Sequence, residues 1–176
     1  YAFLLEYHVQ VWQIQLVNAM GNMAGKYEFA LSLEQVRTVI EFIREKNRDR
    51  QIMVIAADNI GYFDENETHI RGTASPICYW GGCSAGISSL FIDSVGNIKG
   101  CGSLYSDVFI EGNVRNDSLV DIWNSRNAFA YNRQFTIDLL SGRCRGCEVG
   151  NMCRGGCRSS NYFSTQSLYT SAFCCR

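Results

Sequence analysis

Four cysteines stand within fourteen residues near the end of the chain, in the spacing C-x2-C-x5-C-x3-C. They are Cys144, Cys147, Cys153 and Cys157. A further pair, Cys174 and Cys175, follows after sixteen residues. Thiolates at this density repel one another unless a soft metal ion or a metal cluster neutralises them. The spacing therefore predicts metal ligation, with iron–sulfur clusters as the leading interpretation and a structural zinc module as an alternative.

A second cysteine element lies upstream of the first. Cys83 and Cys101 flank Gly96 in the pattern C-x12-G-x4-C, and Cys78 comes just before them. The chain holds nine cysteines, an odd number, and its first 77 residues contain none. A secreted disulfide scaffold would be a smaller chain with an even number of cysteines. Disulfides are therefore the weaker interpretation.

Composition limits the classes of partner. Apolar residues make up 47% of the 176 residues, which is enough for a hydrophobic core, and 16 basic residues balance 17 acidic ones. This balance gives no reason to expect nucleic acid as a partner. No run approaches the roughly 20 apolar residues that a membrane span needs. We expect a cytoplasmic protein that binds neither nucleic acid nor membrane.

The cysteine-free part alternates helix and strand patterns. Residues 1–9 read as the end of a helix, and residues 11–17 and 51–57 read as buried strands. Between the strands, Ser32 and Gln35 form a capping box that begins a helix. One face of that helix is apolar, with Leu33, Val36, Val39, Ile40 and Ile43. Two apolar strands joined through a helix predict a parallel sheet and an α/β fold.

Polar side chains follow both predicted strands. Ligands often bind at the carboxyl ends of parallel strands, which makes Asn18, Asp58 and Asn59 candidates for cofactor or substrate binding. The alternative is that they cap loops and helices. His8 and His69 are isolated, and we expect both to be structural or exposed.

The pattern changes after Gly61. Residues 62–77 are polar and loop-like, so we place a linker there. Further on, residues 90–93 and 97–100 read as two strands of a hairpin. Ser118 with Asp121 begins a short helix, which we expect to bear Leu119, Ile122, Trp123 and Phe129.

Taken together, the cysteine pattern closely resembles the SPASM domain of radical SAM enzymes, an auxiliary-cluster module of peptide-maturation systems. The resemblance extends from residue 78 to residue 175. Sequence words between the cysteines agree with it: Trp80-Gly81-Gly82-Cys83, Gly112-Asn113-Val114, Ser118-Leu119-Val120-Asp121-Ile122-Trp123 and Cys153-Arg154-Gly155-Gly156-Cys157.

The resemblance implies a domain organisation. Residues 1–61 would be the last β–α–β portion of a partial (β/α)6 radical SAM barrel, residues 62–77 a linker, and residues 78–176 the SPASM domain. The family's C-x3-C-x2-C motif is absent, since no cysteine precedes Cys78. The chain also begins at Tyr1 within a helical pattern. We expect a C-terminal fragment that is inactive alone, whose missing half binds S-adenosylmethionine and a third [4Fe–4S] cluster.

The resemblance also implies the ligands of two auxiliary [4Fe–4S] clusters. Auxiliary cluster I would take Cys78, Cys83, Cys101 and Cys157. Auxiliary cluster II would take Cys144, Cys147, Cys153 and Cys174, with Cys175 as the alternative fourth ligand. Cys174 is preferred because Cys175 stands beside Arg176, where fraying would loosen a ligand. Ligation is crosswise, because Cys153 and Cys157 would lie about one helical turn apart yet serve different clusters.

The function that the resemblance implies is modification of a ribosomally made peptide, by cyclisation, thioether or carbon–carbon bond formation, or epimerisation. Sulfatase-maturating relatives carry an acidic residue directly after the cysteine of the glycine motif, where this chain has Gly102. The implied partners are the N-terminal radical SAM half, a precursor peptide and an electron donor such as flavodoxin or ferredoxin. A stand-alone iron–sulfur electron carrier is an alternative, although it leaves the α/β segment unexplained.

Overall fold

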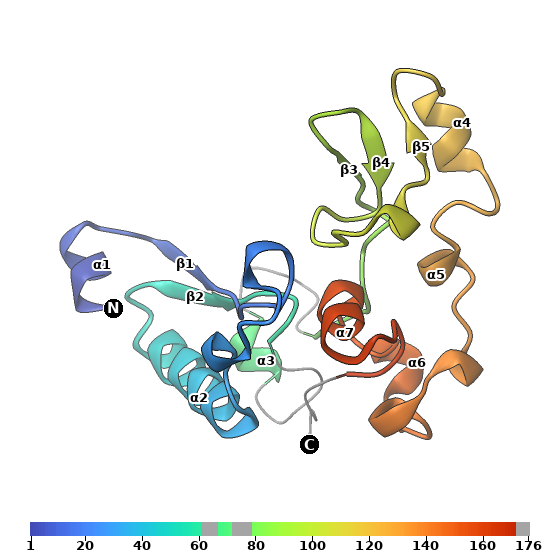
Figure 1. Cartoon of the computed structure of the whole chain (residues 1–176). Helices are drawn as coiled ribbons and strands as arrows, with labels where there is room; N and C mark the ends of the chain where they lie inside the picture. The colour runs from blue at the N-terminus through green and yellow to red at the C-terminus, as the bar shows by residue number, and fades with distance from the viewer. Residues whose placement is uncertain (61–66, 72–78, 172–176) are drawn as a thin grey trace.

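The computed structural model describes residues 1–60, 67–71 and 79–171 (Figure 1). Its first part is built on a parallel pair of strands, β1 (Val11–Ile14) and β2 (Met53–Ala56), in which Val11 lies opposite Met53. Helix α2 (Leu33–Asp49) connects them, after a short helix α1 (Ala2–Glu6) that precedes β1. The predicted parallel β–α–β unit is therefore confirmed. The helix expected over residues 1–9 is shorter, because His8 adopts a positive φ of 54°.

Strand β1 ends at Ile14, although the apolar run continues to Val17. The reason is a side chain that replaces the sheet ladder. The amide of Asn59, which is buried, accepts from Leu16 N at 3.2 Å and donates to Leu16 O at 2.9 Å. The backbone of Leu16 thus finds its partners in a side chain rather than in a neighbouring strand.

Helix α2 begins as the sequence predicts. Ser32 Oγ accepts from Gln35 N, and Gln35 Oε1 accepts from Ser32 N, which is the complete capping box. The helix buries Val36, Ile40 and Ile43 in the core of this unit. That core also contains Leu16, Ile52, Val54, Ala56, Ile60 and Ile70.

The expectation of loop structure is wrong for residues 67–70, which form helix α3 (Glu67–Ile70). Ile70 is fully buried in the core of the α/β unit. Asn47 of α2 fixes α3 to the sheet, since its Nδ2 donates to both Val54 O and His69 O at 2.8 Å. This segment therefore packs as part of the α/β unit. Apart from Arg71, the rest of the predicted linker (62–66 and 72–77) lies outside the described residues.

A small antiparallel sheet begins the cysteine-rich part. Strand β4 (Asn97–Lys99) pairs with β3 (Phe91–Ile92) and with β5 (Gly112–Asn113). The predicted hairpin is confirmed, and β5 adds a strand that the sequence pattern did not indicate. The turn of the hairpin depends on Gly96, which has a φ of +94° and whose added Cβ would lie 2.7 Å from Asn113 Oδ1.

Short helices separated by loops follow: α4 (Leu119–Asn124), α5 (Ala130–Arg133), α6 (Gly150–Cys153) and α7 (Arg158–Thr165). Ser118 caps α4 as predicted, with its Oγ accepting from Asp121 N. The placement of Phe129 on this helix is wrong. The helix ends at Asn124, and Phe129 precedes α5 with a φ of +55° and a fully buried ring. Short 3-10 turns lie at Gly21–Met23, Tyr27–Phe29, Asp107–Phe109, Ile137–Leu139 and Gly142–Cys144.

Helix α7 lies between the α/β unit and the cysteine-bearing loops (Figure 1). Its contact with the α/β unit runs through Asn18, just after β1. Asn18 Oδ1 accepts from Ser160 Oγ at 3.1 Å, and Asn18 Nδ2 is 3.5 Å from Ser159 Oγ. In the described residues, no helix has both the length and the apolar character to cross a membrane.

Candidate metal centre

Six of the nine cysteines lie in the described residues, and all six are free thiols. Cys153 is buried, and the other five are half-buried: Cys83, Cys101, Cys144, Cys147 and Cys157. Cys78, Cys174 and Cys175 lie outside the described residues. The charges that act on Cys153 and Cys157 and the shared buried neighbours associate the other described thiols with these two, although Cys83 and Cys157 also pack against the buried cluster of Trp80 and Cys153.

The first group surrounds Cys153. The pKa of the Cys153 thiol is raised to about 12, first by burial and then by negative charge on Cys144 and Cys147, while the N–H groups of Gly155 and Gly156 oppose the rise. The three thiols therefore lie close enough to repel one another when ionised. The backbone also prepares Cys144 for a negative charge, because Ser171 N donates to its Sγ at 3.3 Å.

The second group surrounds Cys83. Burial raises the pKa of the Cys157 thiol, the backbone N–H of Ser160 lowers it, and negative charge on Cys83 raises it. Cys83 and Cys101 pack against the same buried cluster of Ala85, Leu104 and Phe109. Tyr131 packs there too, and its pKa is raised first by burial and then by charge on Cys83. Ser103 N donates to Cys101 Sγ at 3.4 Å.

The segment between Cys153 and Cys157 explains how neighbouring cysteines join different groups. We expected them one helical turn apart, but they do not share a helix. Helix α6 ends at Cys153, and α7 begins after Cys157. Arg154, Gly155 and Gly156 between them all have positive φ angles, of 55°, 80° and 82°. Two of these three left-handed positions are glycines, which adopt such angles at no steric cost, so the C-R-G-G-C sequence interrupts the helix between the two cysteines.

The donor set fits an iron–sulfur cluster chemically. Both groups consist of thiols, and backbone N–H groups already point at sulfur in each, as they do in cluster sites. In the described part of the chain, no three Cys, His, Asp or Glu side chains are arranged to hold a single metal ion.

The polar candidates at the strand ends have different environments. Asn59 is structural, because both ends of its amide bond the backbone of Leu16. Asn18 contacts the serines of α7 that follow Cys157, as described above. Asp58 is exposed. His8 and His69 are exposed too, in agreement with expectation.

Sequence reasoning missed the polar side chains that hold the cysteine loops. Asn132 donates to Cys83 O at 3.3 Å and to Ala85 O at 2.8 Å. Trp80 Nε1 donates to Cys153 O at 3.3 Å, so the Trp-Gly-Gly-Cys sequence anchors one cysteine segment to another. The buried Arg158 was missed as well, and the only available signal was a charged residue placed directly after a predicted ligand.

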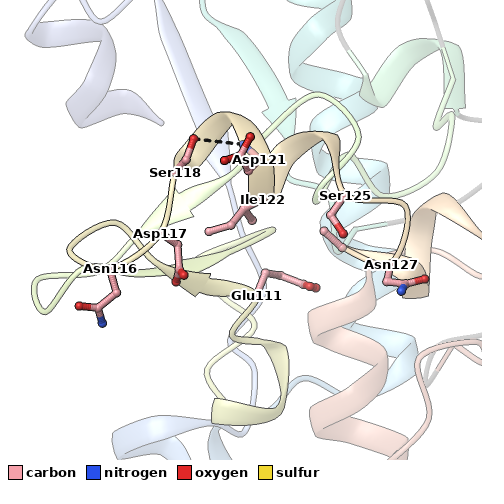
Figure 2. A pocket seen from close by; sticks show the side chains of 9 residues that line it. Glu111, Asn116, Asp117, Ser118, Asp121, Ile122, Ser125 and Asn127 are labelled. Carbon is pink, nitrogen blue, oxygen red and sulfur yellow. Dashed lines mark hydrogen bonds between the residues drawn. The ribbon is translucent and has the colours of Figure 1, made fainter.

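A cavity of about 560 Å³ lies beside β5 and α4 (Figure 2), and none of the described cysteines lines it. Its lining carries three carboxylates, those of Glu111, Asp117 and Asp121. Two of them already hold the backbone, since Glu111 accepts from Phe129 N and Asp117 accepts from Asn113 N. Burial raises the pKa of the Glu111 carboxyl. These contacts give the carboxylates a structural role in closing the corner between β5 and α4.

The chain was compared with known families and proteins. Residues 83–148 match the family model of SPASM, described as an iron–sulfur cluster-binding domain. An AdoMet-dependent heme synthase of Oleidesulfovibrio alaskensis is 39% identical over 82 residues, which are 46% of this chain and 19% of that protein. Mycofactocin maturase MftC of Mycobacterium ulcerans is 34% identical over 83 residues, 47% of this chain and 22% of that protein. The matched segment thus spans about a fifth of the length of these relatives.

Among solved structures, SuiB of Streptococcus suis bound to S-adenosylmethionine is similar in fold, with a TM-score of 0.56. The match covers 97% of this chain and 39% of SuiB, at 18% identity. The shared fold therefore extends over the α/β unit as well as the cysteine-rich part.

Proposed function

We propose that this chain, whose residues 83–148 match the family model of the SPASM iron–sulfur cluster-binding domain, is the C-terminal part of a radical SAM enzyme that modifies a ribosomally made peptide. Relatives about five times as long as the matched segment support a larger parent protein. The parent's N-terminal half would bind S-adenosylmethionine and a third [4Fe–4S] cluster, because no cysteine precedes Cys78 in this sequence. The fragment alone would not catalyse.

The same proposal assigns the domains. Residues 1–61 would form the last part of a partial (β/α)6 barrel, residues 62–77 would form the linker, and residues 78–176 would form the SPASM domain. The parallel β1–α2–β2 unit supports the first assignment, as does a likeness to SuiB that covers nearly the whole chain. Asn18 and Asp58 would then lie on the S-adenosylmethionine and substrate side of the barrel.

Auxiliary cluster I would be held by Cys78, Cys83, Cys101 and Cys157. Two observations on the described residues support this set. Negative charge on Cys83 raises the pKa of Cys157, and Cys83 shares a buried cluster with Cys101. Asn132 would position the Cys83 backbone by its bond to the Cys83 carbonyl.

Auxiliary cluster II would be held by Cys144, Cys147, Cys153 and Cys174, with Cys175 as the alternative. The mutual repulsion of the first three thiols supports this grouping. Ser171 N, three residues before Cys174, donates to Cys144 Sγ, so the chain leading to the fourth ligand already runs beside this group. Trp80 would fix the Cys153 backbone and cover it from solvent.

When bound, clusters fully ligated by cysteine would supply electron transfer, whereas an iron with an open position would bind substrate directly. The residues of this chain prepare the site for negative charge. Backbone N–H groups of Ser103 and Ser171 donate to ligand sulfurs. The burial of Cys153 and the half-buried state of the other described thiols limit access of water.

The position after Cys101 argues against sulfatase maturation. A Cβ added at Gly102 would lie 3.0 Å from Phe91 Cδ2, so the acidic residue of that subfamily would press against this ring. The maturase relative supports a peptide substrate, and the heme synthase relative makes a tetrapyrrole the comparison substrate. In the parent enzyme, a change in peptide mass that depends on S-adenosylmethionine would support the first, and turnover of the tetrapyrrole alone would refute it.

The observation that carries the proposal is the gathering of six described free thiols around Cys153 and Cys157, which supports two cluster ligand sets. Iron and sulfide analysis of the anaerobically reconstituted chain tests it. We expect about eight irons per chain with matching sulfide and a broad visible absorbance. A colourless protein that binds zinc without sulfide would favour the zinc module and refute the proposal. The alternative function, a stand-alone electron carrier, would bind the same clusters. It would be distinguished by a parent gene that encodes no C-x3-C-x2-C motif.

A further inference from the structure

Arg158 is a buried cation directly after a proposed ligand. Its side chain is among the largest that the fold buries completely, with 0% exposure. Its Nε donates to Asn132 Oδ1 at 2.8 Å, and its Nη1 donates to Arg154 O at 2.6 Å and to Leu168 O at 2.9 Å. These partners are all neutral. A fully buried guanidinium normally has a carboxylate beside it, because desolvation of an unpaired charge is costly.

No carboxylate pairs with Arg158 in the described part of the chain. The ion pairs found there join Lys46 to Glu45 and Asp49, and Arg71 to Glu67. The rings of Tyr169 and Phe135 face its guanidinium, with centroids at 4.7 and 5.5 Å. Its Nη2 is buried and has no hydrogen-bond partner in this part of the structure. Among the described residues, Arg158 therefore has neither a carboxylate counter-charge nor an acceptor for Nη2.

Cysteines of both groups stabilise the charge of Arg158 when they are ionised. Burial lowers the pKa of Arg158, and negative charge on Cys83 opposes this lowering most. Negative charge on Tyr169 and, to a smaller extent, on Cys153 opposes it too, whereas the positive charge of Arg154 lowers the pKa further. Covalent and hydrogen-bonded links point to the same neighbours. Arg158 follows Cys157 in sequence, reaches the Cys83 carbonyl through Asn132, and bonds the carbonyl of Arg154, which follows Cys153.

We propose that Arg158 is the counter-charge of the auxiliary clusters and that its free Nη2 donates a hydrogen bond to a cluster sulfur. The inference rests on the proposed function, since it requires clusters on these cysteines. A cubane with four thiolate ligands is an anion, and one-electron reduction makes it more negative. A buried cation beside it stabilises the reduced form and raises its reduction potential, as hydrogen bonds to cluster sulfurs do.

The test uses the full 176-residue chain, reconstituted with iron and sulfide, and compares Arg158→Met and Arg158→Lys with wild type. Arg133→Met is the matched control. Arg133 also donates to backbone carbonyls, Gly86 O at 2.6 Å and Trp123 O at 2.5 Å, and lies against two aromatic rings. Its charge acts on Glu111, whereas the charge of Arg158 acts on the cysteines.

We expect Arg158→Met to keep its iron and to reduce the equilibrium constant for one-electron reduction of at least one cluster by about tenfold, a downward shift of about 59 mV. Arg158→Lys should stay nearer to wild type, because it keeps the charge. The shift of the Fe–S stretching bands in D2O should also be smaller in Arg158→Lys than in wild type, because lysine lacks the second guanidinium nitrogen. Arg133→Met should change neither quantity.

Unchanged potentials in a fully loaded Arg158→Met chain would overturn the inference. So would loss of the metal-free fold in both Arg158 variants, which would show a structural residue. Loss of iron in both variants, while their metal-free forms melt like the wild-type metal-free chain, would support it. A wild-type chain that binds no iron–sulfur cluster would instead refute the proposed function, so the two failures are distinguishable.

Discussion

The buried carboxylate of Glu67 joins the α/β unit to the cysteine-rich part, and its removal should be costly. Glu67 Oε1 accepts from Arg71 Nε at 3.1 Å and from Trp80 N at 2.5 Å. Arg71 continues the connection to the end of β2, where it donates to Ile60 O at 2.7 Å and Ala57 O at 3.1 Å. Trp80 continues it to the carbonyl of Cys153. One carboxylate therefore connects the sheet with a proposed ligand segment.

The magnitude follows from burial. The side chains of Glu67 and Arg71 are only 6% and 9% exposed, so solvent screens their interaction weakly. Glu67→Ala removes a carboxylate partner of the Arg71 guanidinium and one acceptor of Trp80 N. The expected loss in the free energy of unfolding is about 3–5 kcal/mol. Glu67→Gln keeps an oxygen that can accept but loses the charge, so about 1.5–3 kcal/mol is expected.

The assay is urea unfolding of the metal-free chain, followed by circular dichroism. Glu45→Ala is the control, because Glu45 forms an exposed ion pair with Lys46 and its removal should leave stability unchanged. A double-mutant cycle of Glu67→Ala with Arg71→Met measures the interaction between Glu67 and Arg71. We expect a coupling energy of about 0.5–3 kcal/mol. A cost below about 1 kcal/mol for Glu67→Ala, or additive effects in the cycle, would refute the reasoning.

Three further predictions concern the cysteines. Cys144→Ala should abolish one cluster and leave roughly half of the iron, and loss of all iron would show that the two sites assemble as one cooperative unit. Adjacent residues of an extended segment point to opposite sides, so only one of the terminal pair should be a ligand. Cys174→Ala should remove auxiliary cluster II, and Cys175→Ala should leave it in place, as measured by iron content. Loss of this cluster in Cys175→Ala but not in Cys174→Ala would assign the ligand to Cys175 instead. In the metal-free chain the pKa of Cys153 is about 12, above its usual 9.0, so above pH 9 the folded chain retains a proton that the unfolded chain loses. Stability should therefore be complete below about pH 9 and decline toward pH 12 in urea unfolding, and an equal decline in Cys153→Ala would contradict this origin.

Local signals in the sequence predicted the elements that depend on local contacts. The capping box of Ser32 and Gln35, the apolar face of α2 and the cap of α4 at Ser118 are all present. The parallel pairing of β1 with β2 followed from two apolar strands joined through a helix. In each case the partners are close in sequence, or a single periodicity describes the burial.

Features that depend on distant polar contacts could not be predicted in the same way. The length of β1 is limited by Asn59, a side chain 43 residues from the backbone that it bonds. Helix α3 lies in a polar stretch because Ile70 and Glu67 are buried by partners elsewhere in the chain. The separation of Cys153 from Cys157 depends on the left-handed angle of Arg154, which side-chain type does not indicate. A charged residue such as Arg158 reads as exposed until its surroundings are known.

The two parts of the chain are stabilised by different physical means. Nine buried apolar residues form one continuous core in the α/β unit. In the described part of the cysteine-rich region, the buried apolar residues form three small groups, around Trp80, Leu104 and Ile98. Helices α4–α7 are at most eight residues long, too short to persist without tertiary contacts. Loops of this kind need other constraints, and buried polar side chains supply some of them. Crosswise clusters would add to these constraints, because each would join segments far apart in sequence, so metal binding would stabilise this region further.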